Sequence, residues 1–350
     1  MSFRNLSPHQ MFELMALEHV PSQKFSAETP EEFSRWKDET LPLVIGTLGT
    51  LPEAVPLNPQ LLAEWQDNGL RRQKWLIDVG HHISATMLVN YPPGSEGGDP
   101  LPAIFCLHGH GPYGKTEIMS SAIPGTPMGE YIVRGNNNFG FQMAQRGYVT
   151  YSLDWIGFGE RNDREKPNWR SQANTRDWCN LYYLNATMLG MTSLGINIVH
   201  GRAATDFVTK FAEVDANRLG VMGISGGGAM TLWSALCDSR FKAMEIICYS
   251  DLFAHFGFRD LNYCGMQIAP GLFSLVDVPD LQGLLAPNPL LVNIATEDEC
   301  FLVDTAMACF NQVKDIYRVS GSEDRLELDI FPGGHSWGGN KSEAFFGKWL

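Results

Sequence analysis

A serine flanked by glycines is the chain's first candidate for nucleophilic chemistry. The segment Gly223-Ile224-Ser225-Gly226-Gly227 follows the short apolar run 219–222 and precedes the small and apolar residues of 228–236. A serine at a turn from a strand to a helix needs glycines on both sides, because a Cβ there would collide with the crossing backbone, and such a turn lifts the hydroxyl clear of the sheet. The pattern predicts a catalytic nucleophile at Ser225, with an ordinary glycine-rich turn as the alternative.

A nucleophilic serine needs a base, and the base needs an acid that orients it. His335 follows the last expected strand and precedes the final expected helix, in a glycine-rich loop. For the acid we prefer Asp298, which follows the strand before, and Glu297 and Asp251 remain alternatives. Ligands bind open α/β sheets along the edge formed by the carboxyl ends of the strands. We therefore expect Ser225, Asp298 and His335 to meet at that edge.

Ester or amide cleavage also needs donors for an oxyanion. The backbone N–H of Gly226 comes directly after the serine, and the loop His108-Gly109-His110-Gly111 follows the expected strand 103–107. We expect the N–H of His110 to be the second donor, with Gly111 as the alternative. His108 and His110 as metal ligands would need a third ligand, and the spacing offers none, so we expect no metal and no cofactor.

Aromatic residues are candidates for a substrate pocket, although most aromatics lie in protein cores. We expect a few of them to face substrate: the candidates are Trp155, Phe158, Trp169, Trp178 and Trp337. Arg161 is a candidate for steering a polar or anionic substrate, and a structural ion pair is the alternative.

The elements that must position these residues alternate along the chain. Short apolar runs predict buried strands at 103–107, 148–153, 219–224, 244–248, 290–295 and 326–330. Helical stretches separate or follow them, at 140–145, 192–211, 227–236, 303–316 and 342–349. This alternation predicts a mostly parallel sheet with helices on both faces. Two further strands, 72–78 and 83–89, are expected to be antiparallel at its edge.

The expected domain organisation is one catalytic domain with two additions. Residues 1–65 contain two helix starts, at Ser7-Pro8 and at the capping box Thr29-Pro30-Glu31-Glu32, and predict a helical extension packed on the core. Residues 66–350 form the catalytic domain. Within it, 251–289 interrupts the alternation with scattered aromatics, glycines and prolines, which favours a lid or a substrate wall.

The composition argues against some classes of binding partner. The net charge of −13 comes without any basic cluster, which argues against nucleic acid and anionic membranes as partners. No secretory signal and no run long enough to span a bilayer is visible, so we expect a cytoplasmic protein. The seven cysteines lack the pair spacing of metal sites and predict reduced, mostly buried thiols. Oligomeric state is left open.

From about residue 70 to the end, the chain resembles the dienelactone hydrolase and acetyl xylan esterase-like group of α/β-hydrolases. Four segments carry the resemblance, 108–111, 154–161, 215–228 and 334–335. The insertion, with Cys264-Gly265, 270–272 and 284–289, is similar to that of bacterial acetyl xylan esterases. The resemblance implies the α/β-hydrolase fold, with Ser225 as nucleophile, Asp298 as acid and His335 as base, in the chain order that this fold uses.

Two departures limit what the resemblance implies about substrate. Cephalosporin-C deacetylases carry glutamine where this chain has Gly226, and dienelactone hydrolases carry cysteine where it has Ser225. We expect a serine hydrolase that cleaves short-acyl carboxylic esters, with acetylated carbohydrates among the candidate substrates. A peptidase of the prolyl-oligopeptidase type and a non-catalytic binding protein with a hydrolase fold are the alternatives.

Overall fold

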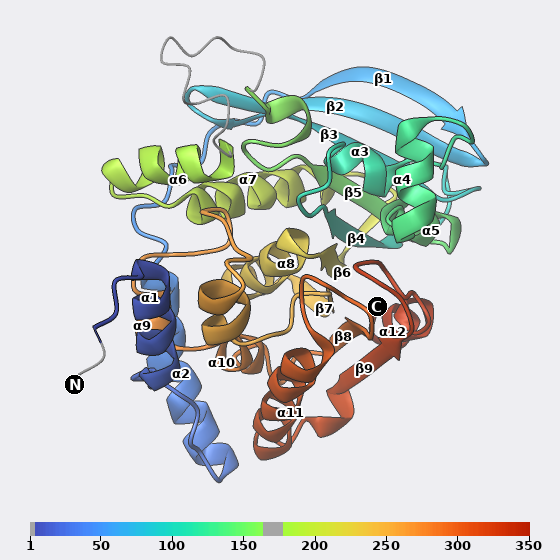
Figure 1. The fold of residues 1–350 in the computed structure, drawn as a ribbon. Coiled ribbons are helices and arrows are strands. Elements are labelled where there is room, and N and C mark those ends of the chain that lie inside the picture. The colour runs from blue at the N-terminus through green and yellow to red at the C-terminus, as the bar shows by residue number, and fades with distance from the viewer. Residues whose placement is uncertain (1–3, 164–177) are drawn as a thin grey trace, which may run out of the picture.

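The computed structural model describes residues 4–163 and 178–350. Its described residues contain one nine-stranded sheet in the order β1-β2-β3-β5-β4-β6-β7-β8-β9 (Figure 1). The strands are β1 Gln60–Asp67, β2 Leu70–Gly80, β3 Ile83–Tyr91, β4 Leu101–Leu107, β5 Val149–Leu153, β6 Val214–Ile224, β7 Phe241–Ile247, β8 Leu290–Ala295 and β9 Leu326–Phe331. The six predicted buried strands are all present, each within a few residues of the expected bounds.

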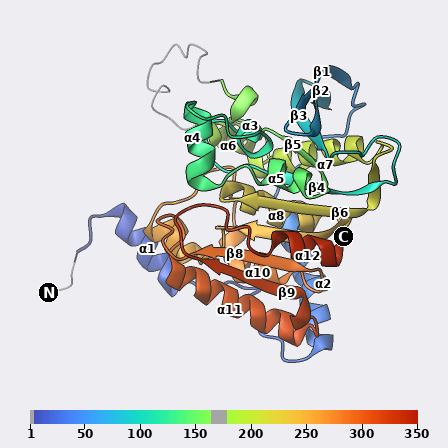
Figure 2. The same ribbon diagram turned by 90° about the vertical axis from the view of Figure 1, so that its right-hand side faces the viewer.

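Strand direction divides the sheet in two. The pairs from β5 through β4, β6, β7 and β8 to β9 are parallel, whereas β1, β2 and β3 pair antiparallel with one another and β3 pairs antiparallel with β5. β1 and β9 lie at opposite ends of the molecule (Figure 2). The mostly parallel α/β-hydrolase sheet predicted from the sequence is confirmed.

The helices flank this sheet and include all five that were predicted. Their bounds are α1 Pro8–Glu18, α2 Pro30–Gly46, α3 Lys115–Met119, α4 Pro127–Gly135, α5 Phe139–Gln145, α6 Trp178–Met188, α7 Ser193–Val208, α8 Gly226–Cys237, α9 Leu272–Leu275, α10 Val278–Gly283, α11 Val303–Val319 and α12 Ser342–Trp349. A π-helix, η3 Phe253–Arg259, and two short 3₁₀ turns, η1 Gly159–Arg161 and η4 Glu323–Arg325, complete the described elements.

Both faces of the sheet are covered, so side chains alternate between two apolar layers. Helices α7, α8 and α11 cover one face, while α3, α5 and α12 cover the other (Figure 1). Along β6, Leu219 and Val221 belong to the first layer, and Met222 and Ile224 belong to the second. Burial on both faces explains why these strands appear in the sequence as continuous apolar runs.

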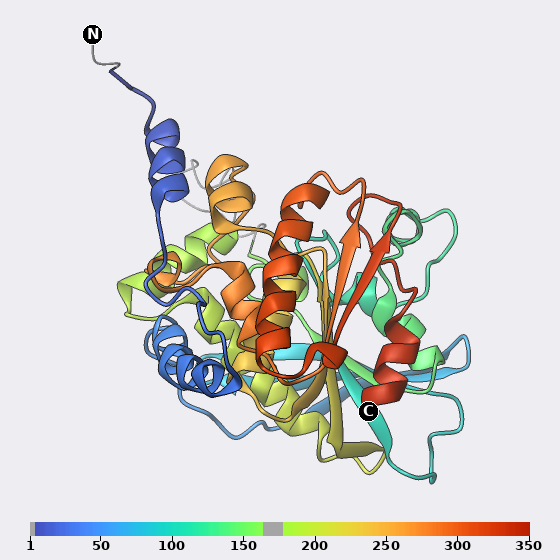
Figure 3. The same cartoon turned by 90° about the horizontal axis from the view of Figure 1, so that it is seen from below.

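The N-terminal extension packs against the insertion. The backbone N–H of Ser22 donates to Ser274 O at 3.0 Å, and that of Gln23 donates to Leu275 O at 2.8 Å. His9 and His19 of the α1 region contact the carbonyls of Phe258 and Phe273 across the same interface, each at 3.0 Å. Helix α1 itself extends from the body of the molecule (Figure 3). The sheet begins with β1 at Gln60, so the edge of the fold starts before the expected boundary at 65/66.

Two further observations concern the state of the cysteines and the length of the helices. No disulfide joins any of the seven cysteines, all of which lie in the described part of the chain, and five of them are buried. Within 4–163 and 178–350, no helix combines the length and apolar character that crossing a bilayer requires.

Candidate active site

Ser225 occupies the turn between β6 and α8 with φ 58° and ψ −123°, a backbone region that non-glycine residues rarely adopt. Its N–H donates to Ile247 O on β7 at 2.9 Å, which fixes the turn to the sheet. A Cβ on Gly227 would overlap Leu107 O, and one on Gly223 would overlap the backbone of Gly227. The glycines around Ser225 are therefore required by the close crossing of the backbone.

His335 and Asp298 form a hydrogen bond of 2.8 Å between Nδ1 and Oδ2. Asp298 lies in the loop after β8 and its side chain is 1% exposed, whereas His335 follows β9 and is 29% exposed. The other carboxylate oxygen accepts the N–H groups of Cys300 and Phe301, at 2.7 and 3.1 Å. Burial opposes ionisation of Asp298, but the hydrogen bond and charge of His335 together with these N–H groups hold its pKa below the usual value.

The two alternative acids are placed elsewhere. Glu297 is exposed and its backbone N–H donates to Gly333 O. Asp251 accepts the hydroxyl of Thr305 at 2.7 Å and the N–H of Leu252, and burial raises its pKa. Among the three candidates, Asp298 is the one hydrogen-bonded to His335.

Ser225 and His335 line one cavity of about 340 Å³. The loop after β4 contributes its glycines and His110, and the insertion contributes Leu261–Cys264 and Gln267. Side chains that sequence reasoning did not select complete a polar wall, namely Glu117, Tyr131, Asn137, Asn262 and Tyr263. The part of the insertion that was expected to form a substrate wall thus borders the cavity.

The loop from His108 to Gly111 runs directly against Ser225. A Cβ on Gly109 would lie 2.9 Å from Ile224 O and 3.0 Å from Ser225 Cβ. The N–H groups of His110 and Gly111 have no protein acceptor among the described residues. The N–H of Gly226, in the first turn of α8, has no partner within its helix. In the part of the chain that the structure describes, these three N–H groups are thus available to donate to a bound ligand.

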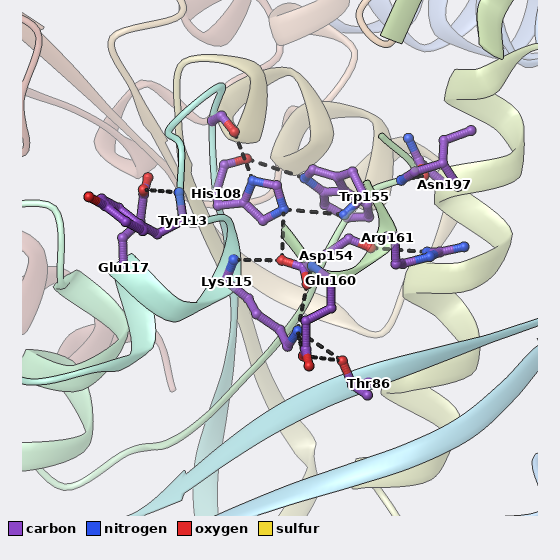
Figure 4. Close-up of polar contacts among 12 residues, drawn as sticks. Thr86, His108, Tyr113, Lys115, Glu117, Asp154, Trp155, Glu160, Arg161 and Asn197 are labelled. Atoms are coloured by element: carbon purple, nitrogen blue, oxygen red, sulfur yellow. Dashed lines mark hydrogen bonds and ion pairs between the residues drawn. The ribbon is translucent and has the colours of Figure 1, made fainter. Parts of the chain in front are cut away.

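A buried charge network anchors this loop to the loop after β5 (Figure 4). The Asp154 carboxylate accepts the backbone N–H of Lys115 at 2.8 Å, the Lys115 Nζ at 2.5 Å and the N–H of Glu160 at 3.0 Å. Lys115 Nζ also donates to Glu160 and to Thr86. Because both Lys115 and Asp154 are almost fully buried, losing either partner would leave an uncompensated charge.

Residues 2–333 match the model of the Abhydrolase family. The chain belongs to the Abhydrolase family. A curated relative, "Putative hydrolase YtaP" of Bacillus subtilis, is 25% identical over 313 residues, which are 87% of this chain and 96% of YtaP.

Solved structures share the fold of this Abhydrolase family member. A putative acetyl xylan esterase of Bacteroides fragilis superposes with a TM-score of 0.75 at 18% identity, covering 94% of this chain and 83% of that chain. A glucuronoyl esterase of Solibacter usitatus superposes with a TM-score of 0.64 at 15% identity, covering 90% and 93%. The resemblance inferred from the sequence is confirmed at the level of family and fold.

Contrary to expectation, Trp155, Trp337 and Arg161 lie outside the lining of the cavity that contains Ser225. Trp155 is fully buried and its indole N–H donates to His108 O at 3.3 Å. Trp337 is buried too, and its indole N–H donates to Glu245. Arg161 donates to Asp154 O and contacts His200, in its own pocket beside α6 and α7. None of the three lines the cavity of Ser225.

The other aromatic candidates also do not line that cavity. Phe158 is buried against the rings of His108 and His110, with centroids 5.6 and 5.2 Å away. Trp178 packs on Tyr182 at the start of α6. Trp169 lies outside the described residues.

The two histidines of the loop have different surroundings. His108 is buried, accepts the N–H of Trp155 at its Nε2, and donates from Nδ1 to Gly109 O at 2.7 Å. Burial lowers its pKa, so it is a neutral structural residue. His110 Nε2 instead lies 3.0 Å from Cys264 Sγ, and Cys179 lies close to both. His110 therefore lies beside two thiols that come from distant segments of the chain.

Proposed function

We propose that the chain is a serine hydrolase of carboxylic esters, with Ser225 as nucleophile, His335 as base and Asp298 as acid. The observation that carries the proposal is the Asp298–His335 hydrogen bond at the rim of the cavity that holds Ser225 in its strained turn. The three side chains come from loops after β6, β8 and β9, at the carboxyl ends of parallel strands. A buried acid, a half-exposed histidine and a presented hydroxyl are the components of acyl transfer.

The reaction proceeds in two steps. Ser225 Oγ attacks the ester carbonyl while His335 Nε2 takes its proton, and Asp298 stabilises the resulting imidazolium. The tetrahedral oxyanion accepts hydrogen bonds from the N–H of Gly226 and from that of His110 or Gly111. On collapse, the alcohol leaves with the proton from His335. Water, deprotonated by His335, then cleaves the acyl-enzyme and releases the acid.

The cavity favours short-acyl esters of polar alcohols. A space of about 340 Å³ accommodates a short acyl group and part of an alcohol. Glu117, Asn137 and Gln267 border it, and the Oε1 of the buried Gln267 has no partner among the described residues. An acceptor without a partner favours a ligand that brings a hydroxyl. The fold neighbours described as esterases of acetylated xylan and of glucuronoyl esters agree with such substrates.

A covalent probe tests the nucleophile. We expect a fluorophosphonate to label Ser225 and Ser225→Ala to abolish both labelling and nitrophenyl acetate cleavage, because the proposed acyl-enzyme forms on the Ser225 hydroxyl. The neighbouring Ser336→Ala is the matched control and should retain both. Full turnover by Ser225→Ala would rule out this nucleophile, and an ester panel with sugar, aromatic and lactone alcohols would then define the substrate of the active enzyme.

A further inference from the structure

Three metal-ligating side chains that the proposed reaction does not use meet at the wall of the cavity. The Nε2 of His110 and the Sγ atoms of Cys179 and Cys264 all lie within 4.8 Å of one another. They come from the loop after β4, from the start of α6 and from the insertion, so more than 150 residues separate the first from the last. His110 and Cys264 line the cavity.

We propose that His110, Cys179 and Cys264 bind one soft divalent cation of the Zn²⁺ class, with the fourth coordination position facing the cavity. Tetrahedral zinc with Zn–N near 2.0 Å and Zn–S near 2.3 Å holds its ligand atoms about 3.5–3.8 Å apart. The three atoms are already within about an ångström of that spacing. Two sulfurs and one imidazole select zinc-like ions over magnesium or calcium, which prefer oxygen.

Charge balance fits this assignment. Cys179 and Cys264 are both buried, and each thiol gives its proton to solvent when the ion binds. Two thiolates neutralise the dication, so the occupied site carries no net charge. A neutral complex avoids the cost of burying an isolated charge.

The backbone around the two thiols is already arranged for such a site. Gly265 N–H donates to Asn180 Oδ1 at 2.8 Å, and Gly265 O accepts the hydroxyl of Ser193 at 2.7 Å. The first bond joins the residue after Cys264 to the residue after Cys179, and the second joins Gly265 to the start of α7. A Cβ on Gly265 would overlap Tyr183, which shows how closely the two segments approach.

The sulfur of Cys264 also accepts a hydrogen bond from the backbone. The N–H of Met266 donates to Cys264 Sγ at 3.4 Å, a contact that stabilises a thiolate. A second cluster of this kind, Cys248 with Asp298 and His335, contains the acid and base of the proposed triad and is not offered as a metal site.

Occupation of the site is expected to slow ester cleavage, and this part rests on the proposed function. The His110 ring lies against Gly226, where a Cβ would be 3.0 Å from its Nδ1. An ion bound to that ring would hold the loop that supplies an oxyanion donor and place a coordinated water at the cavity wall. Disturbing one such donor lowers turnover about tenfold or more.

Metal binding is measured without reference to activity. The full chain, purified with reductant and freed of metal, is titrated with Cd²⁺ and Co²⁺ and dialysed against Zn²⁺ with elemental analysis. We expect one ion per chain, a thiolate-to-cadmium charge-transfer band and a tetrahedral cobalt spectrum. Cys179→Ser and Cys264→Ser each remove one of two thiolates, so the band should fall to about half or less of the wild-type intensity. Zn²⁺ binding should weaken by at least about 100-fold, since loss of second-shell contacts alone costs 10–100-fold.

Two further variants separate ligation from general damage. Cys300→Ser removes another cavity-lining thiol outside the cluster and should leave metal binding unchanged. Asn180→Ala leaves every ligand in place and removes the hydrogen bond from Gly265 N–H to Asn180. We expect it to weaken metal binding by about 10–100-fold. Circular dichroism and thermal unfolding confirm that each variant is folded. Absence of the thiolate band in wild type, a band of undiminished intensity in Cys179→Ser, or a Cys179–Cys264 disulfide in the alkylated protein would each overturn the proposal.

An activity measurement tests the expected inhibition. Zn²⁺ should inhibit nitrophenyl acetate cleavage by wild type and by Cys300→Ser but not by Cys179→Ser, whose thiol lies outside the cavity lining. Equal inhibition of wild type and Cys179→Ser would assign the effect to another site and refute the inhibitory role. A metal-free wild type without any esterase activity would instead count against the proposed function, while the binding measurements would still decide the metal site.

Discussion

At the scale of single residues, Asp298 is the side chain whose role depends most on its neighbours. Its carboxylate divides its two oxygens between His335 and a pair of backbone N–H groups, so it can hold the imidazole in one tautomer and orientation. Asp298→Asn keeps the shape of the side chain and replaces one carboxylate oxygen, an acceptor, by an amide nitrogen, a donor. We expect kcat to fall by about 10⁴-fold, as for other triads with the wrong histidine tautomer.

Glu297→Gln is the matched control for that substitution. Glu297 is the adjacent exposed residue, and its replacement should leave kcat nearly unchanged. Steady-state kinetics with nitrophenyl acetate measures both, and a larger loss in Glu297→Gln would reverse the assignment of the acid.

Gly109 is a second residue at the site that could not be larger without displacing its neighbours. An added Cβ would lie 2.9 Å from Ile224 O and 3.0 Å from Ser225 Cβ, too close for backbone atoms that cannot move aside. Gly109→Ala should therefore shift the loop of oxyanion donors and lower kcat by about 10²-fold, the cost of a displacement near 1 Å. Gly98→Ala is the control, because a Cβ there meets no atom closer than 3.7 Å. Unchanged kcat in Gly109→Ala would show that the loop does not need this close approach.

At the residue scale, the sequence could predict which residues lie together where the chain order constrains their position. Ser225, Asp298 and His335 could be selected because each follows a buried strand, and parallel strands bring such loops to one edge. Trp155 and Trp337 could not be placed, because core and pocket aromatics have the same local pattern. Cys179 and Cys264 were missed because only tertiary folding brings them to His110.

At the scale of elements, the N-terminal extension holds part of the insertion in place through hydrogen bonds. Gln23 N–H donates to Leu275 O, and Phe25 N–H donates to the buried Asp280 carboxylate. Gln23→Pro removes the first donor, so we expect faster hydrogen exchange in the insertion around residues 271–278 and no change in β6. Gln23→Ala retains the N–H and should behave like wild type. Equal exchange in the proline variant would mean that the extension does not hold this segment.

Physical reasons explain why the sequence pattern did not predict some of the elements. β1 is almost entirely exposed along its length, so no buried face imposes alternation on its residues. α3 is only five residues long, and α4 begins after the loop that ends at Thr126. The buried strands, in contrast, have apolar residues on both faces and were predicted from that signal alone.

At the scale of the whole molecule, buried carboxyl groups give stability a specific pH dependence. Burial raises the pKa of Glu117 to about 7, that of Glu245 to about 7 and that of Asp277 to about 6. A carboxyl whose pKa is raised on folding binds more protons in the native state. The free energy of unfolding therefore decreases as pH rises from the unfolded pKa, near 4, to the folded value. Asp298 has a lowered pKa, so its contribution is lost only in stronger acid.

Glu117→Gln tests this dependence. The amide oxygen can still accept the N–H of Tyr113 and carries no charge to desolvate. We expect the variant to melt a few degrees above wild type at pH 8 and close to wild type below about pH 4, where Glu117 is protonated in both states. Calorimetry at several pH values measures the slope, and Glu130→Gln on the exposed side of α4 is the control. Identical slopes in the variant and wild type would exclude Glu117 as a source.

The contact between the first 25 residues and the insertion also determines when the cavity wall can form. The bonds of this interface join residues about 250 positions apart, so they close one of the longest loops in the chain. During synthesis the extension emerges before its partner, which follows β7 in the chain. Contacts of such long range form late in folding. We therefore expect the sheet and the Ser225 turn to assemble before the extension docks, so that newly made chains acquire substrate selectivity last.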